Sequence, residues 1–188
     1  MNLTENKRYI FLSIIALLSA WLANNTEILQ ISKKASPAHS PDYFSSGYMK
    51  WQMNEQGTLK STLIADKITH YSDDGTSHTI KPIMTFFNDK TPPWVITSET
   101  GFLSADGKNL QLNGKVKIDR AESKDHREIT INTSNMKVQP EINYAETQEW
   151  AELINYPHKT TGTGMNMTYI EPIHIEFLAH VKGNYVTK

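Results

Sequence analysis

The sequence predicts an all-β protein built from antiparallel strands. Apolar residues occupy alternate positions in one stretch, at Leu110, Leu112, Val116 and Ile118, which is the period of a strand with one dry face. The pair Asp106-Gly107 just before them favours the positive φ angles of a tight hairpin turn. Similar short patterns separated by turn signals recur down the chain, as in β-sandwiches and barrels.

The central element is a hairpin over residues 94–119, and strand patterns flank it on both sides. We expect further strands over residues 48–53, 59–71, 78–86, 129–138, 142–154 and 165–181. Leu59, Leu63, Ala65 and Ile68 form the inward set of the second of these. The segment 150–154 also fits a single helical turn, but it is too short to define a helix. Gly114 interrupts the hairpin, where a bulge or bend is expected.

A sequence pattern similar to that of the hairpin occurs earlier in the chain. Ser72-Asp73-Asp74-Gly75 and Ser104-Ala105-Asp106-Gly107 lie 104 − 72 = 32 residues apart. At that offset the matched pairs are His78 with Leu110, Ile80 with Leu112, Pro82 with Gly114, Met84 with Val116, and Phe86 with Ile118. Repeated hairpins that cannot bury their dry faces alone must stack. We therefore expect an elongated, open-ended sheet pair whose edge strands are blocked or used for pairing with another chain.

The N-terminus carries an apolar segment, Tyr9–Ala23, behind Lys7 and Arg8. It fits either a signal peptide or a membrane anchor. Its helical length of about 22 Å favours a signal peptide, whereas the bulky residues three positions before each possible cleavage site and the aromatic residues at both ends favour an anchor. We expect a cytoplasmic tail over 1–8, a transmembrane anchor over 9–24, a tether over 25–42 and a β-domain over 43–188.

The composition excludes several classes of function. The net charge of −1 does not favour binding to nucleic acid. The absence of cysteine excludes disulfides and thiolate sites. His70, Asp73, Asp74 and His78 could form a metal or acid–base cluster, but solvated flanks of a hairpin turn are favoured because no metal-ligand spacing is present. The acidic pairs Glu99 with Asp106 and Glu141 with Glu146 are interpreted as surface. No nucleophile elbow is found, so we expect no enzyme, cofactor or metal.

Two features point to a binding role. Methionines are spread through the expected sheet, and their flexible side chains suit either variable apolar ligands or an ordinary core. The final strand pattern, Ile173 to Tyr185, contains no proline, as expected of an edge that pairs with a partner.

Several motifs, in order, resemble one family. They are Pro-x-Tyr at 41–43, Leu-Ile-Ala-x-x-Ile-x-x-Tyr-Ser at 63–72, Pro82 before Thr85-Phe86, Pro93-Trp94, and Asp-Gly-Lys-x-Leu-x-Leu-x-Gly-x-Val from 106. Together they resemble LptC, the family of membrane-anchored lipopolysaccharide export proteins of Gram-negative bacteria. The resemblance implies a twisted, open, OstA-like β-jellyroll in the periplasm, held to the inner membrane by a single pass. It also implies that the domain bridges the lipopolysaccharide ABC transporter to LptA.

The resemblance further implies which residues bind. The expected lipid-binding groove comprises Tyr48, Thr79, Met84, Phe86, Leu112, Val116, Ile118 and Ile131. The expected LptA-facing edge comprises Ile175, His180 and Tyr185. Pro157 departs from the family pattern, which has Gly after the Tyr. The alternative is a membrane-tethered assembly scaffold that pairs by edge strands and binds no lipid.

Overall fold

The computed structural model describes residues 3–25, 39–88, 91–170 and 172–186, and the chain divides into the units Met1–Ala38 and His39–Lys188. The first unit contains one helix, α1 (Leu3–Asn25), which includes the predicted anchor. By length and apolar character, none of the helices in the described ranges could cross a membrane. The transmembrane assignment of 9–24 stays a prediction. Most of the predicted tether lies outside the described residues.

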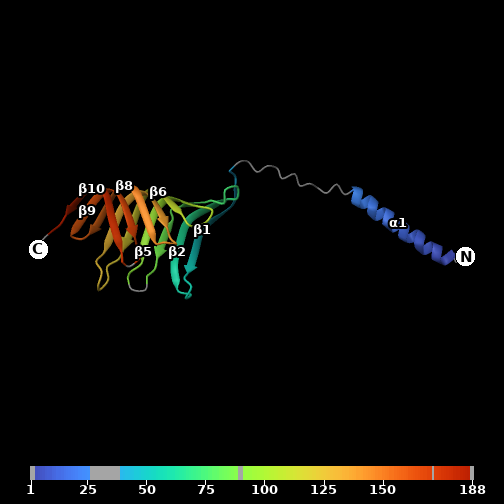
Figure 1. Cartoon of the computed structure of the whole chain (residues 1–188), viewed down its shortest axis with the longest axis horizontal. Helices are drawn as coiled ribbons and strands as arrows, with labels where there is room; N and C mark the ends of the chain where they lie inside the picture. The colour runs from blue at the N-terminus through green and yellow to red at the C-terminus, as the bar shows by residue number, and fades with distance from the viewer. Residues whose placement is uncertain (1–2, 26–38, 89–90, 171, 187–188) are drawn as a thin grey trace. The chain divides into compact units, whose positions relative to one another are not determined.

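The second unit is a single antiparallel sheet, as the sequence predicts (Figure 1). Its ten strands are β1 (Pro41–Met53), β2 (Leu59–Tyr71), β3 (Ser77–Ile80), β4 (Ile83–Phe86), β5 (Trp94–Leu103), β6 (Leu110–Arg120), β7 (Ile129–Gln139), β8 (Tyr144–Asn155), β9 (His158–Thr168) and β10 (His174–Asn184). The predicted hairpin is β5–β6. The helical alternative for 150–154 is wrong, because these residues pair with β9 as part of β8.

The sheet is open at both ends. Its strand order is β1-β2-β3-β5-β6-β7-β8-β9-β10, and β4 continues the path of β3 between β2 and β5. In the described residues β1 pairs only with β2 and β10 only with β9, and the two strands lie at opposite ends of the domain (Figure 1). This confirms the expectation of an open-ended sheet.

A line of irregular positions runs across the sheet near the middle of its strands, and we call it the crease. Residues with positive φ lie on it in six places: Gly47, Lys81, Gly114, Asn135, Gly164 and His180. Register shifts accompany it in each pairing from β5–β6 to β9–β10. Bulges of this kind bend strands. The crease therefore divides the sheet into two halves whose apolar faces meet.

Polar contacts join neighbouring strands along the crease. Lys81 Nζ lies 3.1 Å from Asp66 Oδ2, and Lys81 N donates to Glu99 O over 2.8 Å. Asn135 accepts from Gly114 N through Oδ1 at 3.1 Å and donates through Nδ2 to Glu149 Oε1 at 3.3 Å. These contacts extend from β2 to β8 and hold the irregular positions in line.

The core lies between the two halves. Residues from β2 to the end of β9 form one buried cluster, in which Ile118, Ile131, Met136, Val138 and Met165 are fully buried. Leu63, Ala65 and Ile68 are buried as predicted, whereas Leu59 is half-buried.

The crease explains which residues are buried. Relative to their neighbours, β6 and β8 carry one extra residue at the crease. In each of these two strands, the buried residues have the same parity of residue number, even or odd, on both sides of the crease. Leu112 and Val116 are examples in β6. In β7, which has no extra residue, the buried set changes parity between Thr133 and Met136. A strand without an extra residue turns its other face inward at the crease. In a strand with an extra residue, the alternation shifts by one position there, so the same alternate residue numbers stay buried.

The expected 32-residue repeat is therefore confirmed for one part of its matched residues and wrong for the other. The two matched turns touch, because a Cβ on Gly75 would lie 2.9 Å from the Ala105 Cβ. Met84 and Phe86 are buried like Val116 and Ile118. The expected match of His78 and Ile80 with Leu110 and Leu112 is wrong, because Ser77 and Thr79 are the buried residues of β3 and Ile80 is exposed.

Candidate functional site

The space between the two halves is the candidate site. It collects the residues predicted for the groove: Thr79, Met84, Phe86, Leu112, Val116, Ile118 and Ile131 are all buried. Tyr48 is half-buried and packs against the cluster from β1. The pKa of Tyr48 is raised, chiefly by burial. The predicted residues thus share one apolar interior, which side chains fill over most of its length.

A cavity of about 230 Å³ opens this interior at the β1 end, and we call it the mouth. One half contributes Lys50, Leu63 and Met84, and the other contributes Leu103 and Leu110. Met84 is the only predicted groove residue that lines it. The leucines that line the mouth were not among the predicted groove residues, although their alternation with polar neighbours marks them as inward-facing.

Aromatic side chains pack between the two halves beyond the mouth-lining Met84, two residues further along β4. The rings of Phe86 and Tyr169, from different halves, lie 4.6 Å apart. Next to Phe86, the buried Trp94 carries the Arg120 guanidinium 4.9 Å from the centre of its ring. Burial raises the pKa of the Tyr169 phenol well above its usual range. The interior therefore contains both an open cavity and a region of packed rings.

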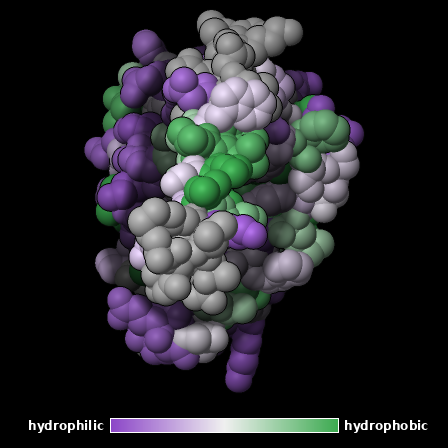
Figure 2. Space-filling model, turned by 90° about the vertical axis from the view of Figure 1, so that its right-hand side faces the viewer, coloured by the Kyte–Doolittle hydropathy of each residue, from purple (hydrophilic) through white to green (hydrophobic). Residues whose placement is uncertain are grey.

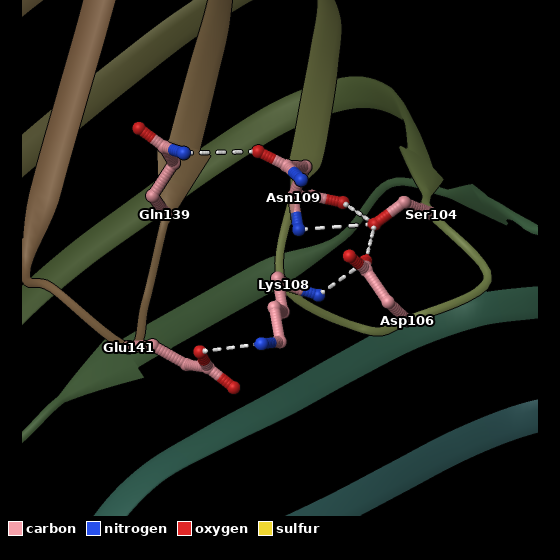
Figure 3. Close-up of polar contacts among 6 residues, drawn as sticks. All are labelled: Ser104, Asp106, Lys108, Asn109, Gln139 and Glu141. Carbon is pink, nitrogen blue, oxygen red and sulfur yellow. Dashed lines mark hydrogen bonds and ion pairs between the residues drawn. The ribbon is translucent and has the colours of Figure 1, made fainter.

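The β5–β6 turn forms one rim of the mouth and is held by polar contacts (Figure 3). Asp106 Oδ1 accepts from Ser104 Oγ at 2.5 Å and from Lys108 N at 3.0 Å, and these bonds lower the pKa of Asp106. Gln139 Nε2 donates to Asn109 Oδ1 over 3.1 Å, and Lys108 Nζ lies 3.7 Å from Glu141 Oε2. The turn is thereby fastened to the β7–β8 connection.

The three residues predicted for the C-terminal edge lie in different environments. Ile175 is half-buried and packs against the core. His180 is exposed on the crease with φ 52°. Tyr185 is exposed beyond β10, with its ring 5.6 Å from that of His158 and its hydroxyl 3.4 Å from Thr160 Oγ1. His180 and Tyr185 are thus on the surface, whereas Ile175 faces inward.

The opposite edge strand, β1, exposes apolar side chains that sequence reasoning did not select. Tyr43, Phe44, Met49, Trp51 and Met53 are all about half exposed or more. Figure 2 shows hydrophobic residues, in green, among hydrophilic ones, in purple, on one face of the chain. The signal in the sequence was the loss of alternation in this segment, since a strand with no dry face gives no period of two.

Fold and site together define a class: open antiparallel sheets with an apolar interior and two edge strands that, within the described residues, pair on one side only. The sequence model of the family described as "Lipopolysaccharide-assembly, LptC-related" matches residues 9–186, and the chain belongs to this family.

Two curated relatives show the same degree of similarity. The "Lipopolysaccharide export system protein LptC" of Escherichia coli (strain K12) is 27% identical over 108 residues, which cover 57% of this chain and 54% of the relative. The protein of that name from Shigella flexneri gives the same values. The chain thus spans about half the length of the curated relatives it matches.

A solved structure is also similar. It is the crystal structure of LptH from Pseudomonas aeruginosa, described as "the LptA homologous periplasmic component of the conserved lipopolysaccharide transport device". The alignment covers 81% of this chain and 99% of that chain, with a TM-score of 0.49 and 6% sequence identity.

Proposed function

We propose that this chain takes part in lipopolysaccharide transport from the inner to the outer membrane by receiving the acyl chains of the lipid between the two halves of its sheet. The observation that carries the proposal is the family match over residues 9–186. The apolar interior with a mouth at the β1 end supports it. The proposal contains no chemical step and needs no cofactor.

The driving force is burial of hydrocarbon. Each CH₂ kept out of water contributes about 0.8 kcal/mol, so a bare lipid with many acyl carbons would cost tens of kcal/mol to move through an aqueous compartment. An interior lined by aliphatic and methionine side chains, such as Leu63, Met84 and Leu110, offers an environment similar to that of the membrane. Transfer between similar apolar environments has no steep step.

Acyl chains need more space than the mouth provides. Ile118, Ile131 and Met136 are fully buried, so the two halves must separate before lipid can occupy the middle of the interior. The bulges of the crease are the natural place for this movement, because irregular pairing interrupts the ladder there. We expect separation to begin at the mouth, because a cavity already lies between the two halves there.

The two edge strands define the proposed partners. We assign β1 to the ABC transporter, because it is unpaired on one side and exposes apolar side chains such as Phe44 and Trp51. We assign β10 to LptA, with Ile175, His180 and Tyr185 as edge residues. Adding a strand to a free sheet edge supplies main-chain hydrogen bonds and needs no cavity.

The proposal places the chain at the inner membrane with its β-domain in the periplasm. α1 supports this placement through the apolar side chains in its sequence, including Phe11, Leu17 and Leu22. After alkaline carbonate extraction, the full chain should stay with the membrane pellet. Its release into the supernatant would contradict the anchor and leave the interior proposal standing.

Photo-crosslinking tests the interior directly. A photoreactive phenylalanine analogue is placed at Met84, which lines the mouth, or at its neighbour Thr85, which is half-buried outside the mouth lining. With lipopolysaccharide added to the full chain, position 84 should label the lipid and position 85 should not. Equal labelling, or none at position 84 in a folded variant, would rule out the groove.

One observation favours a second candidate, a scaffold that only pairs by its edges. The middle of the interior is already filled by side chains. A scaffold predicts crosslinks from Tyr185 to LptA together with no lipid labelling at position 84. The transport proposal predicts both.

A further inference from the structure

A cluster of three side chains lies at the start of the edge strand, away from the interior. His39, two residues before β1, places its Nδ1 3.4 Å from Asp73 Oδ2 and 3.6 Å from Asp74 Oδ2. All three residues are exposed. We propose that they form a site for a divalent transition-metal ion of the zinc class, which fastens the beginning of β1 to the β2–β3 turn.

The distances fit a coordination shell. Zinc binds imidazole nitrogen and carboxylate oxygen at about 2.0–2.2 Å in tetrahedral geometry, which separates neighbouring ligand atoms by about 3.3–3.6 Å. The two separations from His39 Nδ1 fall in this range, and the three ligand atoms lie within 4.8 Å of one another. An ion at the centre would need only small movements of side chains.

Contacts around the cluster orient its members. The second carboxylate oxygen of Asp74 accepts from Thr76 N at 2.9 Å and from Thr76 Oγ1 at 2.6 Å. These two bonds hold the Asp74 carboxylate in one orientation. The His39 ring stacks on Tyr71 with 4.2 Å between centroids and 1° between planes. Fixed ligands of this kind are what metal sites require.

The chemistry of the ligands selects the ion. Imidazole suits Zn²⁺, Ni²⁺ and Cu²⁺, whereas Mg²⁺ and Ca²⁺ prefer oxygen ligands alone. Three protein ligands on the surface leave room for water in the fourth position. The ring centroid of the neighbouring His78 lies 6.1 Å from that of His39, and His78 is not part of the group whose ligand atoms lie within 4.8 Å of one another.

Binding would act on the edge strand. β1 begins at Pro41 and is paired with β2 alone among the described residues. An ion shared by His39, Asp73 and Asp74 would close the chain segment from residue 39 to residue 74 into a loop. The ion would then attach the N-terminal end of β1 to the end of β2, its partner strand. The opening of this end of the β1–β2 pair would be slower.

The test uses the full chain without a polyhistidine tag, treated with chelator and then titrated with Zn²⁺. Native mass spectrometry should find one zinc per chain. His39→Ala and Asp74→Asn should each weaken binding by at least about tenfold. An Asn side-chain oxygen can still accept from Thr76, so D74N retains the turn. His174→Ala, an exposed histidine on β10, is the matched control and should not change the affinity.

Hydrogen exchange tests the consequence. Zinc should slow the exchange of amides in residues 42–46 of the unmodified chain and leave the His39→Ala variant unchanged. An affinity for zinc that His39→Ala does not reduce, or no zinc binding at all, would overturn the site. Unchanged exchange in residues 42–46 with zinc bound would overturn its role as a fastening.

Discussion

Two buried threonines show how one hydrogen bond decides the effect of a substitution. Thr79 Oγ1 has no hydrogen-bond partner within the described residues, whereas Thr147 Oγ1 donates to Ser134 O at 2.8 Å and accepts from Glu149 N at 3.1 Å. Burying an unsatisfied hydroxyl is unfavourable. Thr79→Val should therefore raise the free energy of unfolding by about 1 kcal/mol, and Thr147→Val should lower it by about 1–2 kcal/mol.

Urea unfolding followed by circular dichroism measures both changes. The two variants make the same chemical substitution at similarly buried positions, so each is the control for the other. Destabilisation by Thr79→Val as large as that by Thr147→Val would show that the Thr79 hydroxyl has a partner in solution.

Tyr169 should make stability depend on pH in alkaline solution. Its phenol keeps its proton in the folded chain because burial raises its pKa, while an unfolded tyrosine loses its proton near pH 10. Above about pH 10 the unfolded state binds fewer protons, so stability falls as pH rises. Tyr169→Phe should reduce the fall in melting temperature between pH 9 and 11, and the exposed Tyr156→Phe should not. Equal slopes in all three proteins would contradict burial of Tyr169.

At the scale of the element, the crease should be sensitive to added side-chain volume. Gly114 and Gly57 have nearly the same φ, +77° and +78°, but a Cβ at Gly114 would crowd Glu99 whereas Gly57 faces open space. Both Ala substitutions incur the left-handed backbone cost of about 1 kcal/mol. Gly114→Ala should cost about 0.5 kcal/mol more, because the exposed Glu99 side chain must move aside.

Thermal denaturation of the two variants gives this difference, and adding Glu99→Ala to Gly114→Ala should remove most of it. If the two single variants lose equal stability, the β6 bulge has room for a methyl group and the crease is looser than the contacts indicate.

The crease also explains how much of the elements could be predicted. The 94–119 hairpin was predictable because the extra residue in β6 keeps its apolar residues on one parity through Gly114. β3 and β4 have no extra residue, so a continuous period of two placed Ile80 inside when Thr79 lies there. A bulge is set by pairing with neighbouring strands, and that information is absent from a single strand pattern.

At the scale of the whole molecule, the mouth should control lipid uptake if the proposed function holds. Leu103 is half-buried and lines the mouth. Leu103→Trp should fill the cavity and lower lipid labelling from position 84 several-fold while the fold is retained. Leu153→Trp, also half-buried against the core but away from the mouth, is the control and should leave labelling unchanged. Equal labelling in both variants would place the lipid entrance elsewhere.

The sites were predictable to different degrees. Most groove residues follow from which face of each strand is dry, so alternation places Leu112, Val116 and Ile118 inside. His39 could not be joined to Asp73 and Asp74 from the sequence, because they meet only when the chain before β1 returns to the β2–β3 turn. Contacts between distant segments depend on topology, which periodicity does not contain.

The two unpaired edges have a consequence for self-association. They belong to different strands, β1 and β10, so pairing between copies would join unlike surfaces, head to tail. Such heterologous contact need not close, and each added copy leaves one β1 and one β10 free for the next. Light scattering from concentrated solutions should therefore rise without a plateau at any fixed oligomer, and capping either edge with a partner strand should end the growth.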